Sequence, residues 1–189
     1  MQSKKIAVTG GIGSGKSTVC KIIKEAGYTV LSCDKIYSEL LKENAFIEKL
    51  KNAFPQAIVG GQLNRRALAK AVFADGEMLK KLDSIAFPAI MERAHKMLEN
   101  LEIGFVEVPL LFEGGFEKDF DEVWVLTRNK ENILAAVTER SNLTREEVVA
   151  RINSQFDYDG ADLSNCKVIE NDGILSDLRE KINKALKDI

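Results

Sequence analysis

The sequence contains one histidine and three cysteines, too few and too scattered for the common metal and disulfide frameworks. Cys20, Cys33 and Cys166 are odd in number and far apart, and none belongs to a Cys-x-x-Cys pair. A structural zinc site and a disulfide framework are therefore not expected. Reduced thiols are typical of the cytoplasm, where we expect this protein to work.

Long apolar runs and a surplus of one charge are also missing. No apolar stretch approaches the roughly 20 residues that span a bilayer. The chain has 27 basic and 29 acidic residues, so its net charge of −2 does not favour nucleic acid as a partner. With 189 residues, 45% apolar and 30% charged, it suits a compact globular protein, and we expect a monomer without membrane or nucleic-acid partners.

Residues 10–17 read Gly-Gly-Ile-Gly-Ser-Gly-Lys-Ser, directly after an apolar stretch and before a helix-like run. In such a loop the backbone N–H groups turn inward around an anion, Lys16 reaches the β- and γ-phosphates, and the Ser17 hydroxyl can hold Mg²⁺. A plain glycine-rich turn would not need the Lys-Ser pair. The loop predicts a nucleoside triphosphate site, and because it follows the first strand, the N-terminus is not expected to be a cleaved signal. The predicted ligand-binding residues are Gly11, Ile12, Gly13, Ser14, Gly15, Lys16, Ser17 and Thr18.

Short apolar strands alternate with helical patterns along the chain, which is typical of an α/β fold with a parallel sheet. The predicted strands are 5–9, 28–31, 105–108, 123–126 and 167–169. The predicted helices are 16–26, 35–44, 46–54, 65–74, 77–100 with a break or bend at Pro88, 130–140, one that starts at Thr144, and 174–187. Thr144 and Glu147 have the spacing of a capping box, and Gly60-Gly61 indicates a loop.

The helical stretch between the second and third strands predicts an insertion, which we interpret as a substrate domain over 34–102. The nucleotide-binding core is then predicted at 1–33, 103–129 and 163–189, with a helical lid at 130–162.

Three further residues are candidates for phosphoryl transfer. Asp34 follows the second strand, where an acid can meet an acceptor hydroxyl, although it could equally cap the next helix. Glu107 ends the third strand and could help to hold Mg²⁺, or it could simply end the strand. Arg140 could neutralise charge on the triphosphate from a mobile arm, or act only as a helix C-terminal cation.

Four other charged residues have weaker claims. Arg65 could bind an anionic part of the acceptor, but it could also be a solvated helix start. Glu113 is interpreted as part of a solvated turn, and Arg145 and Arg151 as surface charges beside Arg140.

Taken in order along the chain, these motifs closely resemble the dephospho-coenzyme A kinase family. The matching stretches are Val8–Thr18, Cys33–Ile36, Gly61–Arg65, Val108–Glu113, Arg140 with Ala150–Ile152 and Gln155, and Val168–Asn171. The phosphate loop is shared by many enzymes, so the specificity comes from the ordered set and above all from Val-Pro-Leu-Leu-Phe-Glu at 108–113.

This resemblance implies ATP-dependent phosphorylation of the ribose 3′-hydroxyl of dephospho-coenzyme A, with Mg²⁺ as a cofactor. It further implies a P-loop three-layer fold with a five-stranded parallel sheet, a helical substrate domain and a lid. By the resemblance, Asp34 is the base, Lys16 and Arg140 are catalytic, and Ser17 with Glu107 serve the metal. Acceptor contacts are implied for Asp34, Arg65, Pro109 and Leu110.

The chain departs from the family pattern on the acceptor side. Ser32-Cys33-Asp34 replaces the usual Asp-Ala-Asp, Ser38 replaces an arginine, Phe87 replaces the histidine before Pro88, and Glu107 replaces an aspartate. Two other functions remain open at this point. One is a P-loop kinase for another small acceptor, such as a nucleoside monophosphate. The other is a nucleotide-hydrolysing switch, against which stands the lack of an Asn-Lys-x-Asp segment.

Overall fold

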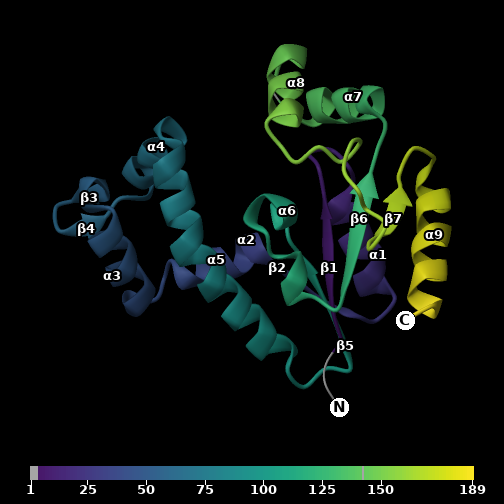
Figure 1. Ribbon diagram of the computed structural model, residues 1–189, viewed down its shortest axis with the longest axis horizontal. Coiled ribbons are helices and arrows are strands. Elements are labelled where there is room, and N and C mark those ends of the chain that lie inside the picture. The colour runs from purple at the N-terminus through teal and green to yellow at the C-terminus, as the bar shows by residue number, and fades with distance from the viewer. Residues whose placement is uncertain (1–3, 142) are drawn as a thin grey trace. The chain divides into compact units, whose positions relative to one another are not determined.

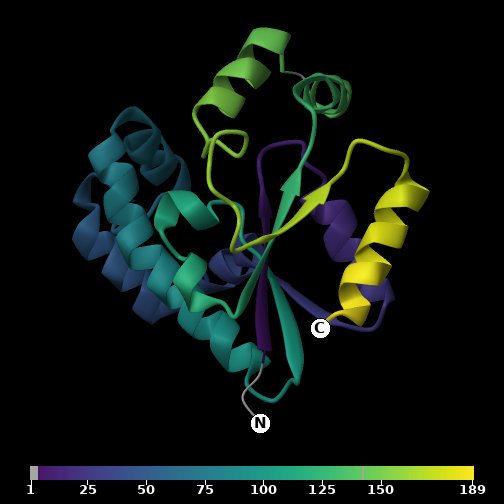
Figure 2. The same ribbon diagram turned by 45° about the vertical axis from the view of Figure 1, so that its right-hand side comes forward.

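A computed structural model describes residues 4–141 and 143–189 (Figures 1 and 2). The backbone forms two compact units, Met1–Leu31 with Leu98–Ile189, and Ser32–Met97. Each unit is considered by itself below. Residues 1–3 of the predicted core and Asn142 of the predicted lid lie outside the described residues.

The first unit contains a five-stranded parallel sheet in the order β2-β5-β1-β6-β7. The strands are β1 (Lys4–Gly10), β2 (Thr29–Ser32), β5 (Ile103–Glu107), β6 (Glu122–Thr127) and β7 (Lys167–Glu170). Because β1 is central, its Val8 pairs with Glu107 on one side and Trp124 on the other. The predicted strands and the parallel α/β fold are confirmed.

Helices α1 (Lys16–Glu25) and α9 (Leu175–Lys187) cover one face of this sheet (Figures 1 and 2). Side chains alternate along β1, so Ile6 and Val8 face these helices while Ala7, also fully buried, points to the other face. Gly27 ends the first helix with a φ of 96°, a left-handed C-terminal cap that glycine adopts without strain. This packing fixes the helix that follows the phosphate loop.

Helices α7 (Lys130–Arg140) and α8 (Arg145–Asn153) stand beyond the carboxyl ends of β1 and β6 (Figure 1). They enclose a small core of their own, in which Leu134, Val137 and Val148 are buried. The predicted capping box is confirmed, since the Thr144 hydroxyl accepts from the Glu147 N–H and the Glu147 carboxylate accepts from the Thr144 N–H. Two short elements, α6 (Leu111–Gly114) and a 3₁₀ turn at Glu117–Asp119, were not predicted.

The second unit is mainly helical. It contains α2 (Cys33–Leu40), α3 (Asn44–Ala53), a 3₁₀ turn (Pro55–Ala57), β3 (Ile58–Val59), β4 (Gln62–Leu63), α4 (Arg65–Ala74) and most of α5 (Gly76–Leu98). Phe46, Leu50 and Phe54 are among its buried side chains. Among the helices of the described residues, none has the length and apolar character to cross a membrane.

Two expectations for this unit need correction. The helix predicted over 35–44 already ends at Leu40. Helix α5 is not broken at Pro88 but continues through it, with Ala86 and Ile90 buried on either side of the proline. The loop predicted at Gly60-Gly61 is confirmed as the turn of a two-stranded hairpin whose short strands were not predicted, and both glycines have a positive φ of 58° and 78°.

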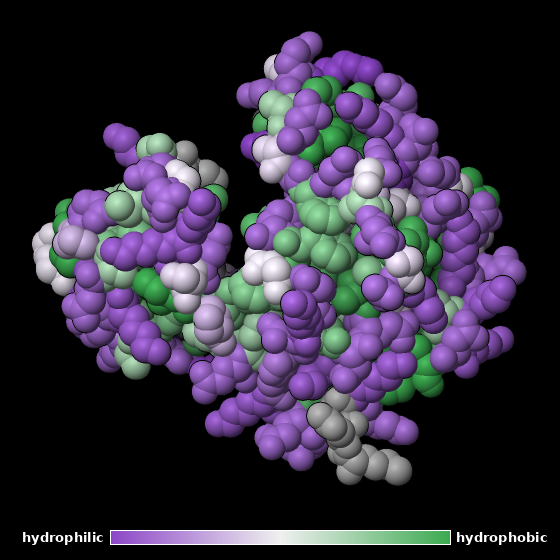
Figure 3. All heavy atoms as spheres, in the orientation of Figure 1, coloured by the Kyte–Doolittle hydropathy of each residue, from purple (hydrophilic) through white to green (hydrophobic). Residues whose placement is uncertain are grey.

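Figure 3 shows hydrophilic side chains over most of the face that it displays. This distribution agrees with the burial of the apolar residues inside each unit.

Candidate active site

The phosphate loop joins β1 directly to α1. Gly10, Gly13 and Gly15 have φ values of 144°, 72° and 100°, a region that residues with a Cβ rarely adopt. Gly15 is also the N-cap residue of α1 and offers no side chain to the first-turn N–H groups. These N–H groups and the positive end of the helix dipole therefore remain available to an anion.

Lys16 is folded back onto the loop that it follows. Its Nζ donates hydrogen bonds to the carbonyl oxygens of Gly10 at 2.6 Å and Gly11 at 2.9 Å. Burial lowers the pKa of Lys16, the nearby Glu107 carboxylate opposes this shift, and the Arg140 guanidinium adds to it. The charges of Glu107 and Arg140, two further residues predicted for metal binding and catalysis, thus act on Lys16.

The candidate metal ligands are oxygen donors, the kind that Mg²⁺ prefers. Glu107 is the half-buried last residue of β5, and Ser17 is exposed in the first turn of α1. Among the described residues no group of three or more His, Cys, Asp or Glu side chains could hold a metal. In kinases Mg²⁺ is bound by one or two protein groups together with substrate phosphates, so this sparse donor set fits it.

The first helix of the predicted lid packs against the loop. A Cβ placed on Gly13 would come within 2.8 Å of Val137 and 2.9 Å of Ile133, both on α7. Arg128, just before α7, donates to the Gly13 carbonyl oxygen at 3.3 Å. Arg140 is the exposed last residue of α7, which brings its charge to the loop.

The segment after β5 carries the candidate acceptor residues Pro109 and Leu110. Leu110 precedes α6 and is 44% exposed, unusually high for a large apolar side chain. Glu113, predicted to lie in a solvated turn, is exposed but also accepts a hydrogen bond from the Phe156 N–H at 3.0 Å. This carboxylate therefore has a structural partner.

Asp34 and Arg65 belong to the second unit. Asp34 is exposed in the first turn of α2, whose N-cap residue is Ser32, so the alternative in which Asp34 caps this helix is wrong. Arg65 begins α4 and donates to the Leu41 carbonyl oxygen at 3.1 Å. Burial raises the pKa of Tyr37, while the charge of Arg65 lowers it and that of Asp83 raises it, so these three polar side chains form one neighbourhood.

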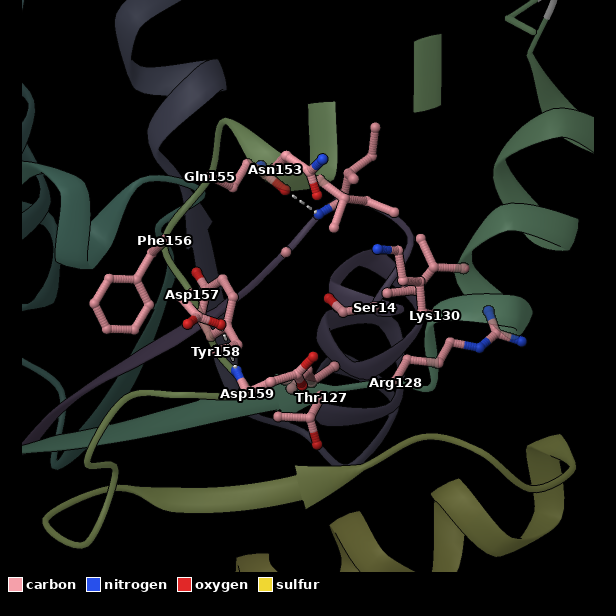
Figure 4. Close-up of a pocket in the computed structure, with 15 residues that line it drawn as sticks. Ser14, Thr127, Arg128, Lys130, Asn153, Gln155, Phe156, Asp157, Tyr158 and Asp159 are labelled. Atoms are coloured by element: carbon pink, nitrogen blue, oxygen red, sulfur yellow. Dashed lines mark hydrogen bonds between the residues drawn. The ribbon is translucent and has the colours of Figure 1, made fainter. Parts of the chain in front are cut away.

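A cavity of about 470 Å³ lies beside the loop, lined by loop residues, by the start of α7 and by the segment after α8 (Figure 4). Two side-chain amides bond to the backbone of the loop. Gln155, which lines the cavity, accepts a hydrogen bond from the Ile12 N–H, and Asn171 donates one to the Ser14 carbonyl oxygen. Both amides lie in stretches that match the family pattern, but no role was predicted for either. Their partners are 143 and 157 residues away, and no local pattern reports a contact of that kind.

Comparison with known proteins gives a consistent result. The sequence model of the dephospho-CoA kinase family matches residues 4–177. A dephospho-CoA kinase of Thermus thermophilus is 39% identical over 186 residues, which are 97% of this chain and 91% of that protein. A crystal structure from Thermus thermophilus has a TM-score of 0.84 at 36% identity and covers 100% of this chain and 99% of its own. A structure of a dephospho-CoA kinase from Campylobacter jejuni has a TM-score of 0.71 at 28% identity, and the match covers 97% of this chain and 96% of that protein.

Proposed function

The chain belongs to the dephospho-CoA kinase family, and we propose that Lys16, Asp34 and Arg140 carry out the family's reaction in it. This reaction is the final step of coenzyme A synthesis, the transfer of the ATP γ-phosphate to the ribose 3′-hydroxyl of dephospho-coenzyme A. The chain is therefore an ATP-using phosphotransferase. The observation that best supports the proposed roles is that Lys16 lies on the phosphate loop within electrostatic reach of Glu107 and Arg140, which shift its pKa in opposite directions.

On the nucleotide side, the loop N–H groups bind the phosphates and Lys16 neutralises charge on the β- and γ-phosphates. Lys16 must leave the carbonyl oxygens of Gly10 and Gly11 to do so, and the phosphate oxygens replace them as acceptors. Arg140 adds a second positive charge where negative charge develops during transfer. Phosphoryl transfer requires this kind of positioning and neutralisation more than covalent chemistry.

On the acceptor side, Asp34 accepts the proton of the 3′-hydroxyl as that oxygen attacks the γ-phosphorus, and ADP leaves. Its exposure and its freedom from capping leave the carboxylate available for this role. Arg65 binds an anionic group of dephospho-coenzyme A, and Pro109 with Leu110 provides an apolar contact. Asp34 and Arg65 both lie in the helical insertion at 34–102, to which we assign acceptor binding. We assign the lid to 130–162 and the nucleotide-binding core to the rest of the chain.

Ser17, through its hydroxyl, and Glu107, through its carboxylate, would hold Mg²⁺, which would supply positive charge against the phosphates. We further propose that the chain works as a monomer in the cytoplasm, where thiols stay reduced. None of the three cysteines forms a disulfide within the described part of the chain, and Cys20 and Cys33 are buried.

Replacing Glu107 with glutamine should raise the Mg²⁺ concentration for half-maximal activity. The amide keeps the size of the side chain but removes the charge that attracts the cation. We expect a shift of about tenfold, as for the loss of roughly 1.4 kcal/mol of binding, with much of kcat recovered at saturating Mg²⁺. The measurement is a titration of activity with Mg²⁺ at fixed ATP.

Glu102 provides the matched control, since it is exposed and precedes the opposite end of the same strand. Glu102→Gln should titrate with Mg²⁺ like the wild type. An unchanged Mg²⁺ requirement in Glu107→Gln would remove Glu107 from the metal site and leave the role of the loop untouched.

A further inference from the structure

Two amide side chains from distant parts of the chain hold the phosphate loop in place. The Gln155 Oε1 accepts a hydrogen bond from the Ile12 N–H at 2.7 Å, and the Asn171 Nδ2 donates one to the Ser14 carbonyl oxygen at 2.8 Å. Figure 4 shows Gln155 reaching from the segment after α8 to the loop. The loop backbone is thus fixed by one acceptor and one donor outside it.

The bond from Gln155 sets the orientation of one loop peptide. Only the oxygen of this amide can pair with Ile12, because the backbone nitrogen is a donor. A Cβ on the neighbouring Gly11 would lie 3.4 Å from the Gln155 Oε1, so the amide lies directly beside this peptide. While the Ile12 N–H points to Gln155, the Gly11 carbonyl oxygen of the same peptide accepts a hydrogen bond from the Lys16 Nζ at 2.9 Å. An anion-binding loop depends on the direction of its successive peptide groups. A rotated peptide between Gly11 and Ile12 would lose both bonds and would disturb the loop together with Lys16.

Gln155 is itself held by residues outside the lid helices. The N–H of the next residue, Phe156, donates to the Glu113 carboxylate, and the Phe156 ring stacks on Phe112 with 4.5 Å between centroids and 21° between planes. Tyr158 packs edge-on against both rings at 5.1 Å and 6.0 Å. The aromatic cluster of Phe112, Phe156 and Tyr158 therefore anchors the segment after α8 to α6. Because the backbone next to Gln155 is already held, ordering this side chain against the loop costs less conformational entropy.

We propose that Gln155 is a positioning residue for ATP, which fixes the Ile12 peptide so that the loop is already shaped for the phosphates before they arrive. This inference rests on the proposed role of the loop as the triphosphate site. Gln155 does not touch the reacting atoms. Its effect should therefore appear in the binding and use of ATP, and dephospho-coenzyme A should bind as before.

Gln155→Met tests the proposal, because methionine has a similar length and no strong acceptor. Loss of the hydrogen bond to the part-buried Ile12 N–H corresponds to about 1–3 kcal/mol, so kcat/KM for ATP should fall by roughly five- to 150-fold. The dissociation constant of MgATP, measured by calorimetry, should rise in parallel. KM for dephospho-coenzyme A should stay near the wild-type value, and the midpoint of thermal unfolding should fall by no more than a few degrees, about 2–4 °C for each kcal/mol lost.

Asn153→Ala is the matched control, as Asn153 is exposed, lines the same cavity and has no loop contact among the described hydrogen bonds. It should behave like the wild type. If Gln155→Met does not fold, Gln155→Glu replaces it. That variant keeps an oxygen acceptor but brings a negative charge beside the phosphates, so its ATP affinity should fall at neutral pH and recover as the carboxylate is protonated.

The proposal is overturned if Gln155→Met binds ATP as tightly as the wild type, or if KM for both substrates rises together with a loss of thermal stability. With Gln155→Glu in its place, an ATP affinity independent of pH would overturn it. A wrong assignment of the loop as the triphosphate site would give a different result, because Lys16→Ala would then bind ATP as tightly as the wild type. This result does not depend on the behaviour of the Gln155 variants.

Discussion

Replacing Asp34 with asparagine is expected to lower kcat by roughly a hundred- to ten-thousandfold, the usual contribution of a general base. The substitution keeps the size of the side chain and removes its ability to take the proton of the acceptor hydroxyl. Since Asp34 lies outside the phosphate loop, the dissociation constant of MgATP should stay within about twofold of the wild type. Steady-state kinetics with dephospho-coenzyme A and calorimetry with MgATP measure the two quantities.

Glu39 is a suitable control, because it is an exposed carboxylate on the same helix and forms an ion pair with Lys42 on the surface. Glu39→Gln should retain near wild-type kcat. A fully active Asp34→Asn enzyme would assign the proton transfer to another group, and a large loss of ATP affinity would mean that Asp34 serves the nucleotide.

Replacing Lys16 with alanine should weaken ATP binding and abolish most turnover. The ammonium group donates to charged phosphate oxygens, and such hydrogen bonds contribute about 1.5–3 kcal/mol, or roughly ten- to 150-fold in affinity. Turnover should fall further, by about a hundredfold or more, because the charge is needed most as the γ-phosphate is transferred. The same calorimetric and kinetic measurements apply.

Lys24 on the exposed side of α1 supplies the control, and Lys24→Ala should bind and turn over ATP normally. An unchanged ATP affinity in Lys16→Ala would contradict the assignment of the loop. Asp34→Asn should change only kcat, whereas Lys16→Ala should change both kcat and the dissociation constant of MgATP. The two variants therefore distinguish a role in acceptor chemistry from a role in nucleotide binding.

The parts of the fold that follow local rules were predictable from the sequence. The glycines and the Lys-Ser pair indicate the strand-loop-helix unit, and Thr144 with Glu147 indicates the capping box. Three features could not be read from local patterns. Helix α5 continues through Pro88, where its neighbours on either side are buried. Helix α6 and the two strands joined by the Gly60-Gly61 turn are too short to show a helical or strand period.

The candidate site divides in the same way. The chemistry expected of Lys16, Glu107 and Arg140 is visible in residue type and order, and in the structure the charges of Glu107 and Arg140 influence the pKa of Lys16. The roles of Asp34 and Arg65 remain predictions that depend on the family resemblance and on their availability in the second unit. Gln155 and Asn171 needed the structure, because their loop contacts join segments from opposite ends of the chain.

Acceptor binding is where the departures of this chain from the family pattern matter most. Ser32, Ser38 and Phe87 stand where the family usually has an acid, an arginine and a histidine, and all three lie in the second unit. The nucleotide loop shows no such departure. The acceptor is therefore the part of the account that most needs a direct measurement.

That measurement is a coupled ADP-release assay with the wild-type protein and MgATP. Dephospho-coenzyme A would be compared with adenosine, nucleoside monophosphates and no acceptor, and the products would be identified by mass. We predict ADP formation only with dephospho-coenzyme A, together with coenzyme A as the product. ADP formed with another acceptor, or equally fast with none, would contradict the assigned reaction.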